Sequence, residues 1–284
     1  MVVAVLALPS IDAIAKFLST TDPAGQVAWT RFLIQAILIA PFVLGSADRE
    51  RSIQVAAQAL RGVLIVTTTV LMFTAVKYMP MADAIAIFFV ELLVVALLSA
   101  MFLGERVGWR RIAAALVGFL GALLVVRPSY ELFGLTAVLP LFVAFCFAFY
   151  MVLTRRLAQS QPVSVLHFNV GVAVFVFLGA MLVIGHIVEI PIFQPVWPTF
   201  FEWSLLALAG LIATAGHLMI VMAFRHLEAS ALAPFQHLEI VAATGFGLWL
   251  FGDFPDSITW LGISIIVGSG LYIFHCERLR ARNQ

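Results

Sequence analysis

Apolar residues run along the chain in ten long stretches, separated by short clusters of charged or turn-forming residues. Most stretches approach the length of about 20 residues that a helix needs to cross a hydrocarbon core of about 30 Å. Segment 187–201, which holds three prolines, is the longest irregular stretch. The pattern predicts ten membrane-spanning helices, at 2–19, 27–46, 55–78, 81–103, 112–126, 133–154, 165–186, 202–225, 229–251 and 257–275.

The composition agrees with this pattern and excludes several classes of protein. Hydrophobic residues make up 63% of the 284 positions and charged residues 11%, whereas about 25% of a typical soluble domain is charged. Sixteen basic against 15 acidic residues leave no basic surface for nucleic acid. The two cysteines lie far apart, so no disulfide framework or metal site is expected. No phosphate-binding loop or catalytic triad is recognisable, and no cofactor is expected.

Basic residues are distributed unequally between the two sets of loops. Twelve of the 16 lie near the loops that follow even-numbered spans or in the C-terminal tail. These are Arg49, Arg51, Arg61, Arg106, Arg110, Arg111, Arg155, Arg156, Arg225, Arg278, Arg280 and Arg282. Only Lys77 and Arg127 lie near the other loops, while Lys16 and Arg31 fall within spans. Because basic residues stay on the cytoplasmic side, both termini are expected in the cytoplasm. The first run lacks a basic start, which favours a retained helix over a cleaved signal peptide.

The sequence also contains an internal duplication. A shift of 148 positions aligns 73–105 with 221–253 without a gap. The alignment pairs sparse charged residues: Lys77 with Arg225, Glu91 with Glu239, and Glu105 with Asp253. With five helices in each copy, an odd number, the second copy enters the membrane from the opposite side. The prediction is therefore an all-α integral membrane protein in two inverted five-helix repeats, at 1–130 and 131–284.

These residues resemble a known family. Ala75-x-Lys77-Tyr78, Glu91 and the sequence of 102–106, together with their second copies, are similar to the EamA-type repeat of the drug/metabolite transporter superfamily. Within it the chain most resembles bacterial amino-acid exporters, including those for aromatic amino acids. The resemblance implies a cavity walled by spans one, three, four, six, eight and nine, with spans five and ten as scaffold. One departure is that many members have proline after the mid-helix acidic residue, where this chain has Leu92 and Ile240.

The candidate site lies near the membrane midplane, where inverted-repeat transporters bind their cargo. Glu91 and Glu239 are central to it, because ionisable residues inside a membrane are costly and are usually functional. The alternative is that each packs the bundle as a protonated or hydrogen-bonded side chain. The same shift pairs Thr69 with His217. His217 could bind substrate, relay protons or form a hydrogen bond with a helix backbone, and the last is favoured. The full set of expected substrate-binding or coupling residues is Lys16, Thr69, Phe88, Glu91, Tyr150, His217, Gln236 and Glu239.

Other polar and aromatic residues have structural interpretations. Lys16 follows Asp12 by one helical turn, which favours an internal ion pair over a substrate contact. Arg31 is expected to extend to the outer headgroups, and Asp83 to complement a helix dipole. The aromatic stripe on span six is either a cavity wall or lipid-facing packing, the latter favoured; it comprises Phe142, Phe145 and Phe149. Close helix contacts are expected at Gly118, Gly121, Gly268 and Gly270.

The leading hypothesis is a secondary transporter that exports small organic solutes, most of all neutral or aromatic amino acids, across the bacterial cytoplasmic membrane. Its partners are then the small-molecule substrate and membrane lipid, with protons as a candidate coupling ion. One alternative is a carrier for another metabolite, such as a quaternary amine or a nucleotide sugar. A nucleotide sugar ranks lower, because few basic residues lie deep enough to bind its phosphates. Another alternative is an intramembrane enzyme, for which His217 with Glu91 or Glu239 is the candidate grouping.

Overall fold

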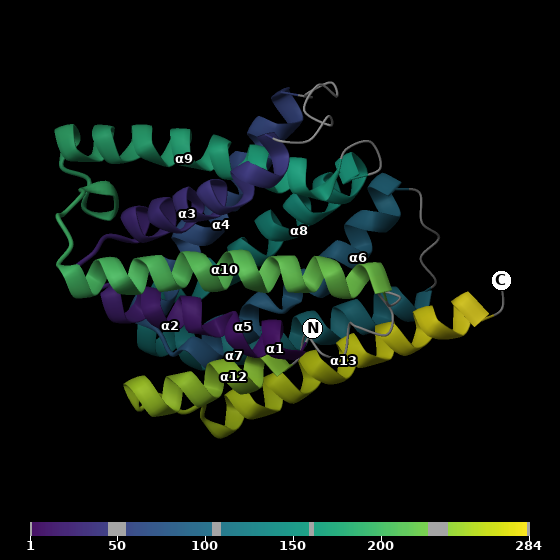
Figure 1. Ribbon diagram of the computed structural model, residues 1–284. Coiled ribbons are helices and arrows are strands. Elements are labelled where there is room, and N and C mark those ends of the chain that lie inside the picture. The colour runs from purple at the N-terminus through teal and green to yellow at the C-terminus, as the bar shows by residue number, and fades with distance from the viewer. Residues whose placement is uncertain (1, 45–54, 104–108, 159–161, 227–237, 283–284) are drawn as a thin grey trace.

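The chain folds into a bundle of helices (Figure 1). The computed structural model describes residues 2–44, 55–103, 109–158, 162–226 and 238–282. The α-helices of the first half are α1 (Val2–Ala7), α2 (Pro9–Leu18), α3 (Ala24–Leu44), α4 (Val55–Tyr78), α5 (Met81–Phe88), α6 (Val90–Leu103) and α7 (Trp109–Phe133). The second half contains α8 (Leu139–Ala158), α9 (Val163–Val188), α10 (Phe200–His226), α12 (Leu238–Phe246) and α13 (Ser257–Arg282). Short helical turns are η2 (Gly134–Val138), η3 (Pro191–Phe193) and the π-helical η4 (Gly247–Phe251).

The helices identify a multi-pass membrane protein. Five stretches within the described residues are long and apolar enough to cross a bilayer by themselves. They are Ala24–Val43, Ala56–Tyr78, Ser129–Leu157, Ser164–Val188 and Phe200–Ile220. Shorter apolar helices cover Leu116–Val126, Leu238–Phe251 and Ser257–Tyr272. The count of ten crossings and the cytoplasmic position of the termini remain predictions.

Two of the predicted spans, 2–19 and 81–103, are each interrupted within the span. The first breaks at Leu8, between α1 and α2, because Pro9 has no backbone N–H to continue the helix. The fourth breaks at Phe89, between α5 and α6, without any proline. This second interruption lies two residues before Glu91, so it directly precedes the acidic residue that the sequence singled out.

Other boundaries differ from the predicted ones. Helix α7 is longer than the predicted span 112–126, because it continues through Pro128 to Phe133. Segment 187–201 is mostly irregular, as expected: between the end of α9 at Val188 and the start of α10 at Phe200 it contains the short turn η3. The predicted sixth span begins later than expected, since residues 134–138 form a 3₁₀ turn rather than α-helix.

Helices from the two halves of the chain interleave. Among the described residues, α7 packs most extensively against α13, and α3 packs against α9. Helix α4 contacts α8 and α9, and α10 correspondingly contacts α2 and α3. Because each half packs largely on the other, the two predicted repeats share one interior.

The contact between α7 and α13 depends on glycine. A Cβ added at Gly121 would lie 2.8 Å from Ile265 Cγ2, and one at Gly262 would lie 2.8 Å from the backbone oxygen of Gly121. A Cβ at Gly118 would clash with Leu93 and Ser269. The expectation for Gly268 is wrong, because an added Cβ there has no neighbour within 4 Å among the described residues.

Candidate functional site

Carboxyl groups from the two halves of the chain meet inside the bundle. Glu91 lies in the first turn of α6 and is 8% exposed. Glu239 lies in the first turn of α12 and is half-buried. Glu91 and Asp12 are the charged neighbours that act electrostatically on Glu239. The structure therefore brings together the two glutamates that the internal alignment pairs, and it adds Asp12 from α2.

Arg31 lies beside this carboxyl cluster. It interacts electrostatically with Asp12 on α2, Tyr150 on α8 and His217 on α10. Its Nε atom is buried and has no hydrogen-bond partner within the described part of the chain. The expectation that Arg31 extends to the headgroups is wrong, because three other helices place polar partners around its side chain. Its position could have been inferred only from how α3 is rotated in the bundle.

A second arginine is buried at the interface of α4 with α8 and α9. Arg61 is 0% exposed, although the sequence counted it among the basic residues near a cytoplasmic loop. Its Nη1 donates to Gln58 Oε1 at 2.7 Å, and its Nε donates to Thr154 Oγ1 at 3.0 Å. Its Nη2 is buried, and no described residue accepts a hydrogen bond from it. Arg61 therefore belongs to the interior and has a donor to spare.

The two arginines are connected through a circuit of polar side chains from five helices. The Cζ atom of Arg61 lies 5.2 Å from the ring centroid of Tyr150, which in turn interacts with Arg31. On the other side, Arg61 is the charged neighbour of His167, whose ring lies 6.3 Å from that of His217. His217 closes the circuit at Arg31. This arrangement, the donor circuit, is rich in N–H and O–H groups and suits an anionic ligand group.

The remaining predicted site residues are more scattered. Thr69 is buried on α4. His217 Nδ1 lies 2.6 Å from the backbone oxygen of Ala213, which is the backbone contact favoured from the sequence. Gln236 lies outside the described residues.

Aromatic side chains line the interior next to the donor circuit. The ring of Phe88, at the end of α5, is 5.4 Å from that of Phe147, which is 5.7 Å from Tyr150. The predicted aromatic stripe of α8 lies on the outer surface, as favoured from the sequence, with side chains 40% to 54% exposed: Phe142, Phe145 and Phe149. The stripe is therefore lipid-facing, and Phe147 on the same helix is the inward phenylalanine.

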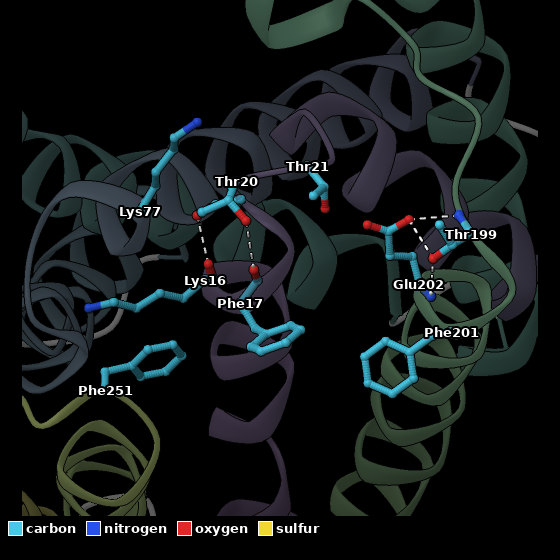
Figure 2. Close-up of a pocket in the computed structure, with 10 residues that line it drawn as sticks. Lys16, Phe17, Thr20, Thr21, Lys77, Thr199, Phe201, Glu202 and Phe251 are labelled. Atoms are coloured by element: carbon cyan, nitrogen blue, oxygen red, sulfur yellow. Dashed lines mark hydrogen bonds between the residues drawn. The ribbon is translucent and has the colours of Figure 1, made fainter.

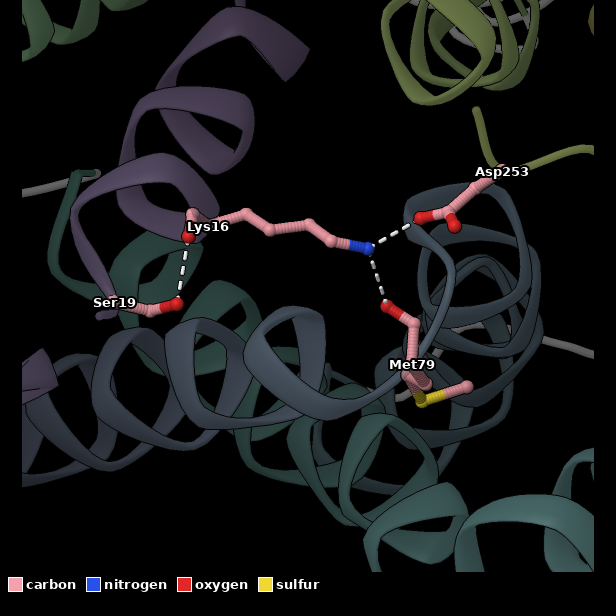
Figure 3. A network of polar contacts seen from close by, with 4 residues as sticks. All are labelled: Lys16, Ser19, Met79 and Asp253. Atoms are coloured by element: carbon pink, nitrogen blue, oxygen red, sulfur yellow. Dashed lines mark hydrogen bonds and ion pairs between the residues drawn. The ribbon is translucent and has the colours of Figure 1, made fainter. Parts of the chain in front are cut away.

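Lys16 forms an ion pair at one end of the bundle (Figure 3). Its Nζ atom is 2.5 Å from Asp253 Oδ2 and donates to the backbone oxygen of Met79 at 3.0 Å. It also lies 4.9 Å from the ring centroid of Phe251. The expected pair of Lys16 with Asp12 is wrong, because Lys16 points to the segment after η4 while Asp12 faces Arg31. The ion pair thus joins the first half of the chain to the second.

A pocket of about 570 Å³ opens beside this ion pair (Figure 2). It lies where α2 and α4 end, where α10 begins and where η4 ends. These ends are the ones that the predicted topology places outside the cell. Of the eight residues expected at the site, Lys16 alone lines this pocket. We call it the outer pocket, and it is separate from the cluster around Glu91.

Polar contacts hold the rim of the outer pocket in place. Gln26 Nε2 donates to Asp22 Oδ1 at 3.1 Å and to the backbone oxygen of Val196 at 3.0 Å, which attaches segment 187–201 to α3. Burial and the negative charge of Glu202 raise the pKa of Asp22 to about 6, although the hydroxyl of Thr21 acts in the opposite direction.

Asp83 is held in place by a hydrogen bond from Ser129. The hydroxyl of Ser129 donates to Asp83 Oδ2 at 3.0 Å, and both residues are buried. The contact joins α5 to α7. A structural role was expected for Asp83, and the structure supplies its partner.

Comparison with known proteins identifies the family. A model of the EamA-like transporter family matches residues 1–127 and 134–274. The chain belongs to this family. A solved structure superposes on it with a TM-score of 0.64 at 20% sequence identity, covering 95% of this chain and 94% of that one. That likeness concerns the fold alone.

Several relatives of this EamA-family chain are named transporters. An S-adenosylmethionine uptake transporter of Rickettsia bellii is 26% identical over 94% of this chain and 89% of its own length. A riboflavin transporter of Vibrio cholerae is 28% identical over 100% and 94%. A pseudopaline exporter of Pseudomonas aeruginosa is 31% identical over 90% and 88%. The chain is thus similar along nearly its whole length to carriers of different small molecules, in both directions of transport.

Proposed function

We propose that this protein is a secondary carrier for small zwitterionic organic solutes, foremost neutral or aromatic amino acids, which it exports across the bacterial cytoplasmic membrane. The observation that supports this most is the presence of ionisable groups of both signs in one buried region. Asp12 and Glu91 act electrostatically on Glu239, and Arg31, which belongs to the donor circuit, acts on Asp12. An amino acid needs partners of both signs.

The energetics favour a ligand in this region. A charged side chain inside a membrane costs about 3 kcal/mol or more, so such groups are retained where they pair or function. Arg31 Nε and Arg61 Nη2 each lack an acceptor among the described residues. A carboxylate bound at the donor circuit would supply acceptors, and its ammonium group would lie toward Glu91 and Glu239. Phe88 and Phe147 offer an apolar surface for the side chain.

Alternating access is supported by the architecture. The family model matches the chain twice, and helices of the two stretches pack against each other across a shared interior. Two similar halves in opposite orientation can exchange conformations, so that the same interior opens to each side in turn. In a carrier driven only by gradients, the net direction follows those gradients, and we propose export.

S-adenosylmethionine is the second candidate substrate. Named carriers of this compound match the chain over 94% of its length, and the compound carries an α-amino acid group besides its sulfonium centre. The same donor circuit and carboxyl cluster therefore suit it. Riboflavin has no such charged pair and uses these groups less well.

Counterflow in liposomes that contain the pure protein tests the proposal. Vesicles preloaded with unlabelled L-phenylalanine should accumulate labelled L-phenylalanine, and parallel vesicles are loaded with S-adenosylmethionine or riboflavin. Accumulation of labelled L-phenylalanine identifies an amino-acid carrier, and accumulation of labelled S-adenosylmethionine alone identifies the second candidate. Accumulation of riboflavin alone, or of none, would contradict a carrier for zwitterions.

Two variants test the carboxyl cluster in the same assay. Glu91→Gln and Glu239→Gln keep the size of the side chain but remove its ionisation. A residue that carries the coupling proton should lose transport driven by a pH gradient and retain counterflow, whereas one that contacts the ammonium group should lose both. Glu189→Gln is the matched control, because Glu189 is an exposed carboxyl at the end of α9. Unchanged transport and pH response in both cluster variants would show that the site is elsewhere.

A further inference from the structure

The outer pocket has opposite charges at its two ends. Figure 2 shows Lys77 and Lys16 at the end near Phe251, and Glu202 at the other end beside Thr199. Lys16 is already paired with Asp253. Lys77 is exposed, and its Nζ lies 5.6 Å from the ring centroid of Tyr78. The pocket therefore offers one cation without an ion-pair partner in the described residues, and one anion.

Glu202 is held in a fixed position before any ligand arrives. One of its oxygens, Oε2, accepts hydrogen bonds from the backbone N–H of Thr199 at 2.6 Å and from the Thr199 hydroxyl at 2.8 Å. These are the contacts of a helix cap at the start of α10. The other carboxylate oxygen is directed toward Thr21 and the pocket in Figure 2. A carboxylate fixed in this way binds a cation without losing further side-chain freedom.

The walls between the two charged ends differ in polarity. One side carries the rings of Phe17, Phe201 and Phe251, of which the first two lie 6.3 Å apart. The other side carries the hydroxyl groups of Ser19, Thr20 and Thr21 at the end of α2. Ser19 donates to the backbone oxygen of Lys16 and Thr20 to that of Phe17, while the Thr21 hydroxyl lies 3.3 Å from both the backbone oxygen of Leu18 and Asp22 Oδ2. These hydroxyl oxygens keep lone pairs that can accept from an ammonium group.

We propose that the outer pocket is a second binding station for zwitterions of the α-amino acid class with an apolar or aromatic side chain, distinct from the buried carboxyl cluster. The ligand carboxylate lies toward Lys77, its ammonium group toward Glu202, and its side chain on the phenylalanine wall. A volume of about 570 Å³ is too large for a single inorganic ion and falls within the range of sites for small organic ligands. The choice of ligand class rests on the proposed function, but the station is a separate site.

The chain offers a direct readout of this pocket. Its sequence contains only two lysines, Lys16 and Lys77, and both line the outer pocket. Acetylation by an amine-reactive reagent, followed by peptide mass spectrometry, therefore reports on the pocket at Lys77. The full-length protein is used in an uncharged detergent, so that lipid headgroups do not compete.

L-phenylalanine is the probe, and two analogues each lack one charge. At ten times its half-protecting concentration, L-phenylalanine should slow the acetylation of Lys77 about tenfold. 3-Phenylpropionate lacks the ammonium group and 2-phenylethylamine lacks the carboxylate, so both should protect less. A short-chain phosphatidylethanolamine is the fourth arm, since its headgroup is also zwitterionic. No protection by L-phenylalanine, equal protection by either analogue, or protection by the lipid alone would overturn the proposal.

Three variants locate the effect. Glu202→Gln retains an oxygen for the cap on Thr199 but removes the charge, and should raise the half-protecting concentration about fivefold. Glu189→Gln, which changes an exposed carboxyl that does not line the outer pocket, should leave it unchanged. Glu91→Gln should also leave it unchanged, even where that variant no longer transports. If protection is lost in Glu91→Gln but kept in Glu202→Gln, then Lys77 reports on the buried cluster. That result would refute the outer station while leaving the carrier function intact.

Discussion

The ion pair between Lys16 and Asp253 gives a direct test of how the two halves of the chain are joined. The perturbations are Lys16→Met, which retains most of the apolar stem, and Asp253→Asn, which retains the shape of the carboxylate. Their side chains are 14% and 28% exposed, so the pair lies between a surface pair and a buried one. Lys16 also donates to the backbone oxygen of Met79 at 3.0 Å, a contact that Asp253→Asn leaves in place.

The magnitude follows from this partial burial. Exposed ion pairs contribute about 0 to 1 kcal/mol, whereas removing one partner of a buried pair costs about 3 to 5 kcal/mol. Each single variant should therefore lower the free energy of unfolding by about 1 to 3 kcal/mol. Lys16→Met should cost more, because it removes the bond to Met79 as well. The double variant should cost little more than Lys16→Met alone, which gives a coupling energy of about 1 to 2 kcal/mol.

Unfolding of the purified protein in mixed micelles of increasing denaturing detergent measures these values. The control is a second cycle between Asp253→Asn and Lys77→Met, because Lys77 lines the same pocket but forms no described ion pair with Asp253. That cycle should be additive within about 0.5 kcal/mol. Additivity in the Lys16 cycle as well would refute the reasoning, since it would show that the two charges do not stabilise one another.

The same pair should influence which side of the carrier is open. It joins α2 to the segment after η4 at the end of the bundle that carries the outer pocket. If the ion pair exists only when that end is closed, its removal takes about 1.4 kcal/mol of stabilisation from the closed form. The equilibrium then shifts about tenfold toward the open form. The reaction rate of a cysteine placed at Ser19, which lines the pocket, should rise accordingly in Asp253→Asn.

Two further predictions concern stability. Gly262→Ala should destabilise the protein by about 1 to 3 kcal/mol, because the added Cβ would lie 2.8 Å from the backbone oxygen of Gly121. Gly268→Ala is the control and should not destabilise it, because an added Cβ there meets no described atom within 4 Å. Equal unfolding curves for the two variants would contradict the close contact of α7 with α13. Because the pKa of Asp22 is raised to about 6 from 3.8, the folded state binds its proton more tightly than the unfolded state. Stability should therefore fall as pH rises from about 4 to 6, and a pH dependence of unfolding that persists unchanged in Asp22→Asn would assign the effect to another group.

Much of the helical framework could be predicted from the sequence, because a lipid environment forces long apolar runs into helices. Every predicted span contains helix in its described part, and irregular segment 187–201 was recognised from its prolines. The break at Phe89 could not be predicted in the same way, because no proline or glycine marks it. The departure at Leu92, where many family members have proline, gave no position for a break in this helix.

The orientation of side chains around the helices was harder to predict. In a soluble helix the apolar face points inward, but in a membrane both lipid and interior are apolar, so periodicity does not separate them. Phe145 and Phe147 lie on one helix, yet the first faces outward and the second faces Phe88. Arg31 and Arg61 were interpreted from their closeness to span ends, whereas the rotation of α3 and α4 turns both inward. Only tertiary packing determines such rotations.

The balance of charge in the buried cluster predicts a link between substrate binding and protons. Of three carboxyl groups in this region, those of Asp12 and Glu91 each act electrostatically on Glu239, while Arg31 is the basic residue that acts on Asp12. Three negative charges against one positive charge are costly in a medium of low dielectric constant, so the cluster must take up protons or another cation. The ammonium group of a zwitterion is such a cation, and it competes with protons for the same carboxyl groups. We therefore predict proton release on substrate binding and proton uptake on substrate release, so that a carrier built on this competition would exchange one for the other across the membrane.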